Sequence, residues 1–244
     1  MRQRLLPVVL VSLLLLSSGC LGTLNPGTSS TSDPSNASTA NLPPGVNKSG
    51  VTNASTLITA HNETLHAKGY TLNGTITLYH RNEKTNKTFR TVVGPNSQQF
   101  HIQAKRVRSK NETGESSIIE KNRFKIWGNS TTTLRHGSLV QGTVPVERLP
   151  SHIARMKAPL RKQTIKSYRF NVTNVVSRNG HTFTTLVGNS SQQQKKSTSR
   201  LIIDERGVIH TAVFEVGNSH FEYRVATLGA SPERPDWVAN TTAM

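Results

Sequence analysis

Hydrophobic and polar residues alternate with a period of two along most of the chain after residue 69. The first apolar series consists of Leu72, Gly74, Ile76 and Leu78, separated by threonine and asparagine. A second series, after the turn signal at residues 94–97, consists of Phe100, Ile102 and Ala104. Alternation of this kind predicts strands that bury one face, and the polar turns between them predict an antiparallel meander.

The remaining strands are expected from the same alternation. In the first half, the polar segments 81–86 and 109–115 are read as breaks, and Lys121-Asn122 as the turn of a short hairpin. In the last third, Asn179-Gly180 between alternating segments is the strongest hairpin signal. Strands are also expected at 198–203, 208–216 and 220–228, which brings the number to about ten.

Helical spacing of apolar residues occurs in two segments. The first starts at Thr52 as the predicted N-cap and ends at Gly69. Its apolar side is formed by Ala54, Leu57, Ile58, His61 and Leu65. We expect His61 to be a packed, hydrogen-bonded core histidine rather than a ligand, because no partner is near it in the sequence.

The second segment lies in the middle of the chain and is basic and amphipathic. Its apolar stripe consists of Leu149, Ile153, Met156 and Leu160, flanked by arginine and lysine. Two interpretations stay open: a surface helix that covers the sheet, and a mobile lid or membrane-facing helix. Pro150 and Pro159 favour two short pieces over one rod.

The N-terminus has the layout of an export signal. A short basic start precedes an apolar run at residues 5–16 and small residues that end at Cys20, the only cysteine. The ending resembles a lipobox, which implies a signal peptide at 1–19 and lipidation of Cys20. An uncleaved anchor and an ordinary cleaved signal are the alternatives. We expect a flexible tether at 20–42, a single domain at 43–238 and a disordered tail at 239–244.

Charge narrows the range of partners. The formal net charge is +17, with basic clusters at 105–110, 155–166 and 195–196. Aromatic residues make up only 5% of the chain and do not alternate with these clusters, so we expect no nucleic acid as a partner. Lipid head groups or an anionic surface polymer are the expected partners. The sequence does not indicate an oligomeric state.

The sequence contains none of the common catalytic motifs. The chain contains no HExxH, CxxC, GxSxG, Walker or GxGxxG motif. Asp204-Glu205 is interpreted as a turn, and Trp127 and Trp237 as packing residues. We therefore predict no enzyme, no metal and no cofactor. Of the Asn-x-Ser/Thr sequons, Asn111 and Asn189 are the preferred candidates for glycosylation because both are expected in polar loops.

The arrangement resembles an uncharacterised family of haloarchaeal lipoproteins. The resemblance rests on Pro43-Pro44-Gly45-Val46, on Ala60-His61 leading into Gly69-Tyr70-Thr71-Leu72, and on a strand set that closes at Trp237. At the level of the fold it is similar to the LolA/LolB carriers and to LppX/LprG-type lipid-binding lipoproteins. The resemblance implies an α+β fold, mostly antiparallel β, in which a strongly curved open sheet or half-barrel carries an N-terminal helix and a mid-chain helical cover.

Two functions follow as hypotheses. The favoured one is a lipid-anchored protein on the extracytoplasmic face of the cell membrane that binds a lipid or other apolar ligand without catalysis. Its cavity would be lined by the two apolar series, in which Gly74 and Ala104 leave room. The alternative is a cell-surface interaction or structural lipoprotein that acts through its basic, glycosylated exterior and holds no ligand.

Overall fold

The structure is a computed structural model that describes residues 41–112, 115–138, 143–145, 160–190 and 197–239. All of them belong to the unit that spans Ala37–Met244. The predicted signal peptide, the lipidation site Cys20 and almost all of the predicted tether lie outside the described residues. The same holds for Leu149, Ile153 and Met156 and for residues 240–244 of the predicted tail.

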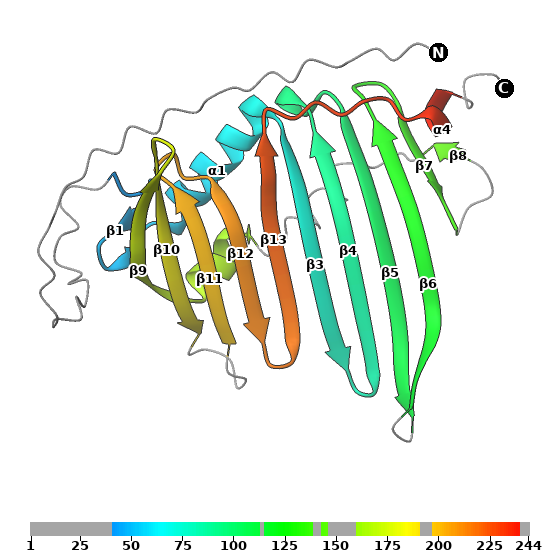
Figure 1. Cartoon of the computed structure of the whole chain (residues 1–244), viewed down its shortest axis with the longest axis horizontal. Coiled ribbons are helices and arrows are strands. Elements are labelled where there is room, and N and C mark those ends of the chain that lie inside the picture. Colours follow the sequence, from blue (N-terminus) through cyan, green and yellow to red (C-terminus); the bar gives the residue numbers. More distant parts are fainter. Residues whose placement is uncertain (1–40, 113–114, 139–142, 146–159, 191–196, 240–244) are drawn as a thin grey trace, which may run out of the picture. The chain divides into compact units, whose positions relative to one another are not determined.

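The fold is built on one sheet of eleven strands, in the order β8-β7-β6-β5-β4-β3-β13-β12-β11-β10-β9. Every neighbouring pair is antiparallel. The strands are β3 (Tyr70–His80), β4 (Glu83–Val93), β5 (Phe100–Glu112), β6 (Glu115–Gly128), β7 (Thr133–Gly137), β8 (Thr143–Pro145), β9 (Arg169–Arg178), β10 (His181–Ser190), β11 (Ser197–Asp204), β12 (Ile209–Val216) and β13 (Ser219–Leu228). Because β8 and β9 stand at opposite ends of this order, the sheet is open. The predicted fold class is confirmed, with one strand more than the number expected (Figure 1).

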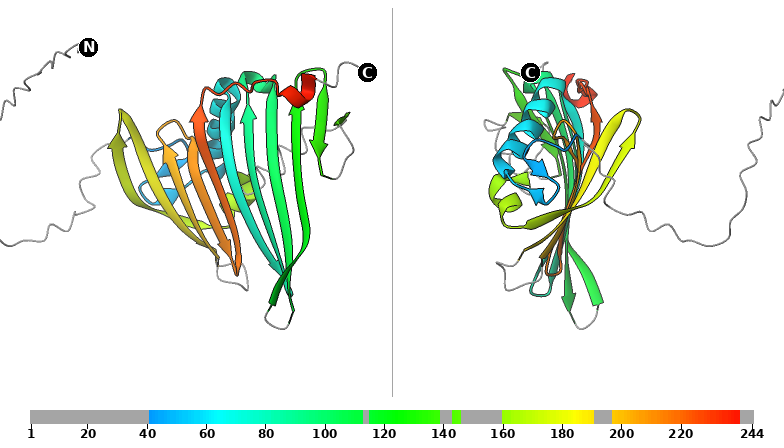
Figure 2. Two further views of the ribbon diagram at one scale, coloured as in Figure 1. Left: turned by 45° about the vertical axis from the view of Figure 1, so that its right-hand side comes forward. Right: turned by 90° about the vertical axis from the view of Figure 1, so that its left-hand side faces the viewer.

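Short elements complete the fold. Strands β1 (Val46–Asn47) and β2 (Gly50–Val51) form a separate two-stranded ladder. The helices among the described residues are α1 (Ala54–Lys68), α3 (Lys162–Lys166) and α4 (Asp236–Ala239), and Pro95–Ser97 forms a 3-10 turn, η2. Figure 2 shows α1 and α3 on one face of the strongly twisted sheet. We call this side the helix face and the other side the opposite face.

Helix α1 is fixed to the helix face by its apolar side. Leu57 and Leu65 are fully buried, and Ala54 and His61 are nearly so. The N-cap is Asn53, whose side-chain oxygen accepts hydrogen bonds from the N–H groups of Ser55 and Thr56, and not the predicted Thr52. Asparagine and threonine are both good caps, so the sequence alone did not separate the two neighbours. Gly69 ends the helix as predicted, at φ 72°.

The predicted role of His61 is confirmed. Its Nδ1 accepts a hydrogen bond from the backbone N–H of Ile209 at 3.1 Å, which places the proton of the neutral ring on Nε2. That nitrogen lies 3.1 Å from the hydroxyl oxygen of the buried Tyr223 and donates to it. His61 therefore joins α1 to two strands of the sheet, β12 and β13, and is satisfied within the core.

The largest error of the sequence-based prediction concerns β5 and β6. These strands form one long hairpin, and neither the break at 109–115 nor the turn at Lys121-Asn122 exists as predicted. Strand β4 likewise starts at Glu83, inside the predicted turn 81–86. Both sequons also fall in strands rather than loops: Asn111 in β5, and Asn189, which is exposed, near the end of β10. Polar composition was mistaken for irregular backbone, because these strand ends pair without burying apolar side chains.

One predicted turn is confirmed, and one residue of the predicted amphipathic stripe can be placed. Asn179 and Gly180 have φ values of 51° and 76° and join β9 to β10, as a two-residue hairpin turn requires. Leu160 of the predicted amphipathic stripe is buried in the main core, immediately before α3. The choice between a covering helix and a lid stays a prediction, because residues 146–159 lie outside the described part.

Candidate functional site

The predicted cavity residues divide into two groups. Leu72, Phe100 and Ile102 point to the helix face and are 0–1% exposed, as parts of the closed core. They fill space rather than line a cavity. Gly74 also fails to leave room, because the ring of Phe89 from β4 lies over it: a Cβ at Gly74 would be 2.1 Å from the Cζ of Phe89.

The second group extends the core as an apolar strip that is partly exposed. We define the apolar strip as the half-buried helix-face residues Ile76, Ala104, Phe124 and Phe221. The register pairs Phe221 with Ile76, and Ala104 with Phe124, so the strip runs across neighbouring strands of the sheet. Leu78, also predicted to line the cavity, is half-buried beyond Ile76 on β3.

Charged side chains replace the apolar strip toward the hairpin end of β5 and β6. Arg108 donates to the carboxylates of Glu83 at 2.8 Å and Glu120 at 3.0 Å, and Arg106 lies 3.6 Å from Glu120. The hydrogen bond from Arg108 lowers the pKa of the Glu83 carboxyl. Arg106 and Arg108 on this part of the helix face are therefore paired with carboxylates.

The opposite face of the same strands has a different charge pattern. Alternation along β4, β5 and β6 places six exposed cations there, at Lys84, Arg90, Lys105, Lys121, Arg123 and Lys125. We call this set the basic face. Within the described part of the chain none of the six makes an ion pair. Lys105 and Arg123 are direct cross-strand partners, an arrangement that is repulsive when nothing anionic lies between them.

A groove of about 570 Å³ crosses the basic face. Its walls are two rows of paired residues: Thr88, Lys105, Arg123 and Ser138 on one side, and Arg90, Gln103, Lys125 and His136 on the other. The side chains of both rows point away from the helix face. The row between them, which includes Ala104 and Phe124, supplies the floor. Ala104, predicted to line an apolar cavity, thus lies at the floor of a groove on the other side of the sheet.

A second groove of about 720 Å³ adjoins the first and shares Arg90, Gln103 and Lys125 with it. Residues 230–237, the segment that leads into α4, form its other wall. His101 lines this groove with a buried Nε2 that has no hydrogen-bond partner among the described residues. Burial, followed by the charges of Lys125 and Arg90, lowers the pKa of His101, so the ring is neutral near pH 7.

Trp127 and Trp237 are packing residues, as predicted. Trp127 and Leu134 form a small core with Val238 of α4, and Trp237 packs against it. Trp237 also stacks on His136 with ring centroids 5.7 Å apart. This second core fixes α4 to the opposite face, where Asp236 and Trp237 line the second groove.

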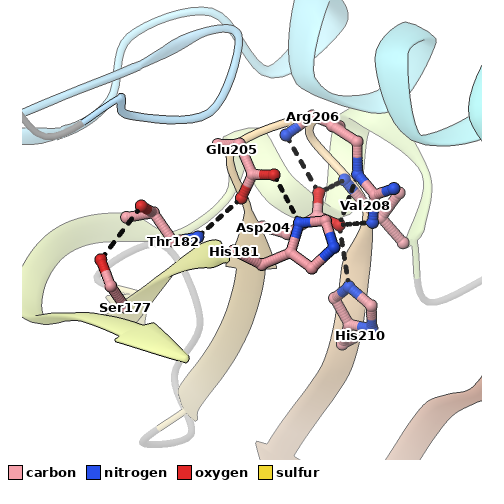
Figure 3. A network of polar contacts seen from close by, with 8 residues as sticks. All are labelled: Ser177, His181, Thr182, Asp204, Glu205, Arg206, Val208 and His210. Atoms are coloured by element: carbon pink, nitrogen blue, oxygen red, sulfur yellow. Dashed lines mark hydrogen bonds and ion pairs between the residues drawn. The ribbon is translucent and has the colours of Figure 1, made fainter. Parts of the chain in front are cut away.

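Asp204 organises the turn between β11 and β12 (Figure 3). It is fully buried and accepts hydrogen bonds from the guanidinium of Arg206 at 2.5 Å, from His210 at 3.0 Å and from the N–H of Val208 at 2.9 Å. Burial alone would raise the pKa of Asp204, but the hydrogen bonds from His210, Arg206 and Val208 outweigh it and hold the pKa well below its usual range.

Glu205 has partners of its own, the ring of His181 at 2.7 Å and the N–H of Thr182 at 2.8 Å. Each carboxylate is thus held by donors of the turn and of the adjacent hairpin, so the predicted turn is confirmed. The arrangement explains stability and does not indicate catalysis.

Two features are absent from the described residues. No group of three or more His, Cys, Asp or Glu side chains there is placed to hold a metal ion. Among the helices of that part, none has the length and apolar character needed to cross a membrane.

The comparisons with known proteins give a likeness in fold only. No family model matches the chain, and no curated protein matches it. Among solved structures, LprF from Mycobacterium bovis is similar with a TM-score of 0.41 and 9% identity, over 75% of this chain and 96% of LprF. The lipoprotein LppX from Mycobacterium tuberculosis gives 0.36 and 11%, over 74% and 98%.

A DUF1329 family protein from Desulfovibrio piger gives a TM-score of 0.26 and 8% identity, over 74% of this chain and 92% of that protein. One of these, LppX, is among the lipoproteins named in the sequence resemblance. With TM-scores below 0.5, these likenesses do not identify what the chain binds.

Proposed function

We propose that the chain is a membrane-anchored, extracytoplasmic lipoprotein that binds a lipid or another apolar ligand on the helix face without catalysing a reaction. The apolar strip carries this proposal. Its four residues continue the closed core but keep part of their surface in contact with solvent. Partly exposed apolar side chains beside a rigid core form a surface that an apolar molecule can complete.

The charges beside the apolar strip favour an amphiphile over a pure hydrocarbon. Ile76 pairs with Lys87, which pairs with Arg106, so cations follow the strip directly along the sheet. The Nε of Arg106 is buried and has no hydrogen-bond partner among the described residues. An anionic head group could accept a hydrogen bond from the Nε of Arg106 while the acyl chain of the same lipid covers the apolar strip. Anchoring at Cys20 and membership of the haloarchaeal family belong to the proposal as expectations from the sequence.

The test is lipid extraction and native mass spectrometry of the full chain, with Cys20→Ser so that a covalent lipid is not counted. We expect a stoichiometric lipid, and we expect Phe124→Glu to lower its occupancy at least tenfold. Val187→Glu is the matched control, because Val187 is an exposed apolar strand residue far from the strip in the strand order. A chain without lipid, before and after incubation with host lipids, would favour the alternative of a surface protein that acts through its basic, glycosylated exterior.

A further inference from the structure

Four large apolar side chains are exposed in the described part of the chain, and three of them cluster at one end of the sheet. Three of them, Tyr79, Ile118 and Ile119, are 47%, 67% and 47% exposed and lie at the same end of the sheet. The register places Tyr79 opposite Lys84, Lys84 opposite Ser109, and Ser109 opposite Ile118. One row that crosses four strands therefore begins and ends with an exposed apolar residue. Ile119 is the extra residue at the bulge beside Ile118. We call these three the apolar rim.

Two residues of the apolar rim lie on the same side of the sheet as the basic face. Tyr79 and Ile118 fall in the same alternation series as the six cations, and Lys84 stands between them with its Nζ 5.7 Å from the centre of the Tyr79 ring. Successive rows away from the rim contain Lys121, then Lys105 with Arg123, then Arg90 with Lys125. The β5–β6 hairpin reaches further than its neighbours at this end (Figure 1).

The distribution of carboxylates shows that this charge is specific to one side. On β4, β5 and β6 the described acidic residues Glu83 and Glu120 belong to the helix face, where they pair with Arg108. Neither of these two carboxylates points to the basic face. On the helix face these strands pair Arg106 and Arg108 with carboxylates, whereas none of the six cations of the basic face has an ion pair among the described residues.

We propose that the basic face and the apolar rim form a docking surface for a membrane that contains anionic lipids. Tyr79, Ile118 and Ile119 enter the head-group region, while the rows from Lys84 to Arg90 contact anionic head groups along the sheet. Each basic residue near such a surface contributes on the order of 1 kcal/mol, equal to about a fivefold change in affinity. The exposed rim argues for a membrane rather than a soluble polyanion, because a polyanion gives apolar side chains no favourable environment. This surface lies opposite the apolar strip and does not depend on the function proposed there.

The test compares binding of the full chain, with Cys20→Ser, to phosphatidylcholine vesicles with and without 30% phosphatidylglycerol. The N-terminal apolar run is the same in all variants, so differences between variants report on the folded part. Lys105→Gln with Arg123→Gln should lower the affinity for anionic vesicles about twentyfold and leave that for neutral vesicles unchanged. Arg169→Gln with Arg200→Gln is the matched control, because it removes the same charge from exposed residues of β9 and β11 and should change binding less than twofold.

A second measurement tests the apolar rim. In the Cys20→Ser chain, a fluorophore that responds to polarity is attached at Ile118→Cys or, as a control, at Val187→Cys. We expect a blue shift on anionic vesicles for the first site and none for the second. Equal loss of affinity in both double variants, or no shift at residue 118, would overturn the proposal. So would charge-dependent binding to polyphosphate in the absence of any preference for anionic vesicles, which would assign the surface to a soluble polyanion.

Discussion

At the scale of single residues, Asp204 shows how this fold uses its few acidic residues. The chain has 13 acidic residues against 30 basic ones, and this one is fully buried. Its carboxylate is stabilised by a guanidinium, an imidazole and backbone N–H groups from one turn (Figure 3). A buried carboxylate with several donors is costly to remove, because the donors then lose their acceptor in a site that water does not reach.

We therefore expect Asp204→Ala to lower the free energy of unfolding by about 3 kcal/mol. Glu215→Ala, which breaks an ion pair with His220 in which the Glu215 side chain is 45% exposed, should cost less than about 1 kcal/mol. Urea unfolding of both variants at pH 7 measures the difference. Equal and small effects would show that the Asp204 network does not stabilise the turn.

The lowered pKa of Asp204 also predicts how stability depends on pH. A carboxyl whose pKa is lower in the folded than in the unfolded chain contributes stability above its unfolded pKa of about 3.9. This contribution is lost as the pH falls from that value toward the folded pKa, because the unfolded chain binds the proton first. Between pH 5 and 2.5, the free energy of unfolding should therefore fall more with decreasing pH for the natural chain than for Asp204→Asn. Unfolding curves recorded at several pH values in this range measure the difference.

At the scale of secondary-structure elements, apolar alternation was sufficient to predict the strands near the core. It failed where a strand leaves the core, as in the distal half of the β5–β6 hairpin. There the pairing is supported by contacts between charged side chains, such as those of Arg108 with Glu83 and Glu120. The alternation of apolar and polar residues does not indicate such contacts. The sequence also did not indicate which distant strands pair. Strand β3 lies beside β13, which comes from the other end of the chain.

The candidate sites were only partly predictable for the same reason. The cluster at 105–110 was recognised as basic, but the pleat sends Lys105 to one face and Arg106 and Arg108 to the other. Arg90 and Arg123 join Lys105 only through the register of β4, β5 and β6. The apolar series were found correctly, but the ring that fills the space at Gly74 comes from the neighbouring strand.

The contact between Gly74 and Phe89 gives a prediction for the β3–β4 pair. Gly74→Ala should lower the free energy of unfolding by about 1–3 kcal/mol, because its Cβ needs the space of the Phe89 ring. In the Phe89→Ala background the same substitution should be neutral or slightly stabilising, since alanine packs better than glycine within a strand. A double-mutant cycle measures this coupling; additive effects would contradict the packing.

At the scale of the whole molecule, the net charge of +17 is a source of internal repulsion. The length over which salt screens these charges falls from about 30 Å at 0.01 M salt to about 8 Å at 0.15 M. We expect the free energy of unfolding to rise by about 1 kcal/mol over this range of sodium chloride. A stability that is independent of salt would show that bound anions already neutralise the cations.

One substitution separates fold stability from the proposed docking. Lys105→Glu places a carboxylate opposite Arg123 and should raise the free energy of unfolding by about 0.5 kcal/mol. The same change should weaken binding to anionic vesicles by more than tenfold, because it reverses a charge at the centre of the basic face. A variant that becomes more stable and still binds as tightly would contradict the role of this row.

On β4–β6, Glu83 and Glu120 lie on the helix face and the six cations of the basic face, unpaired among the described residues, lie on the other side, which gives these strands an electric dipole across the sheet. In the field of a negatively charged boundary such a dipole exerts a torque, which turns the molecule before any contact is made. Collisions would then be productive more often than random orientation allows. The arrangement of charge thus selects the side that arrives first and leaves the helix face, with its apolar strip, turned toward the solution.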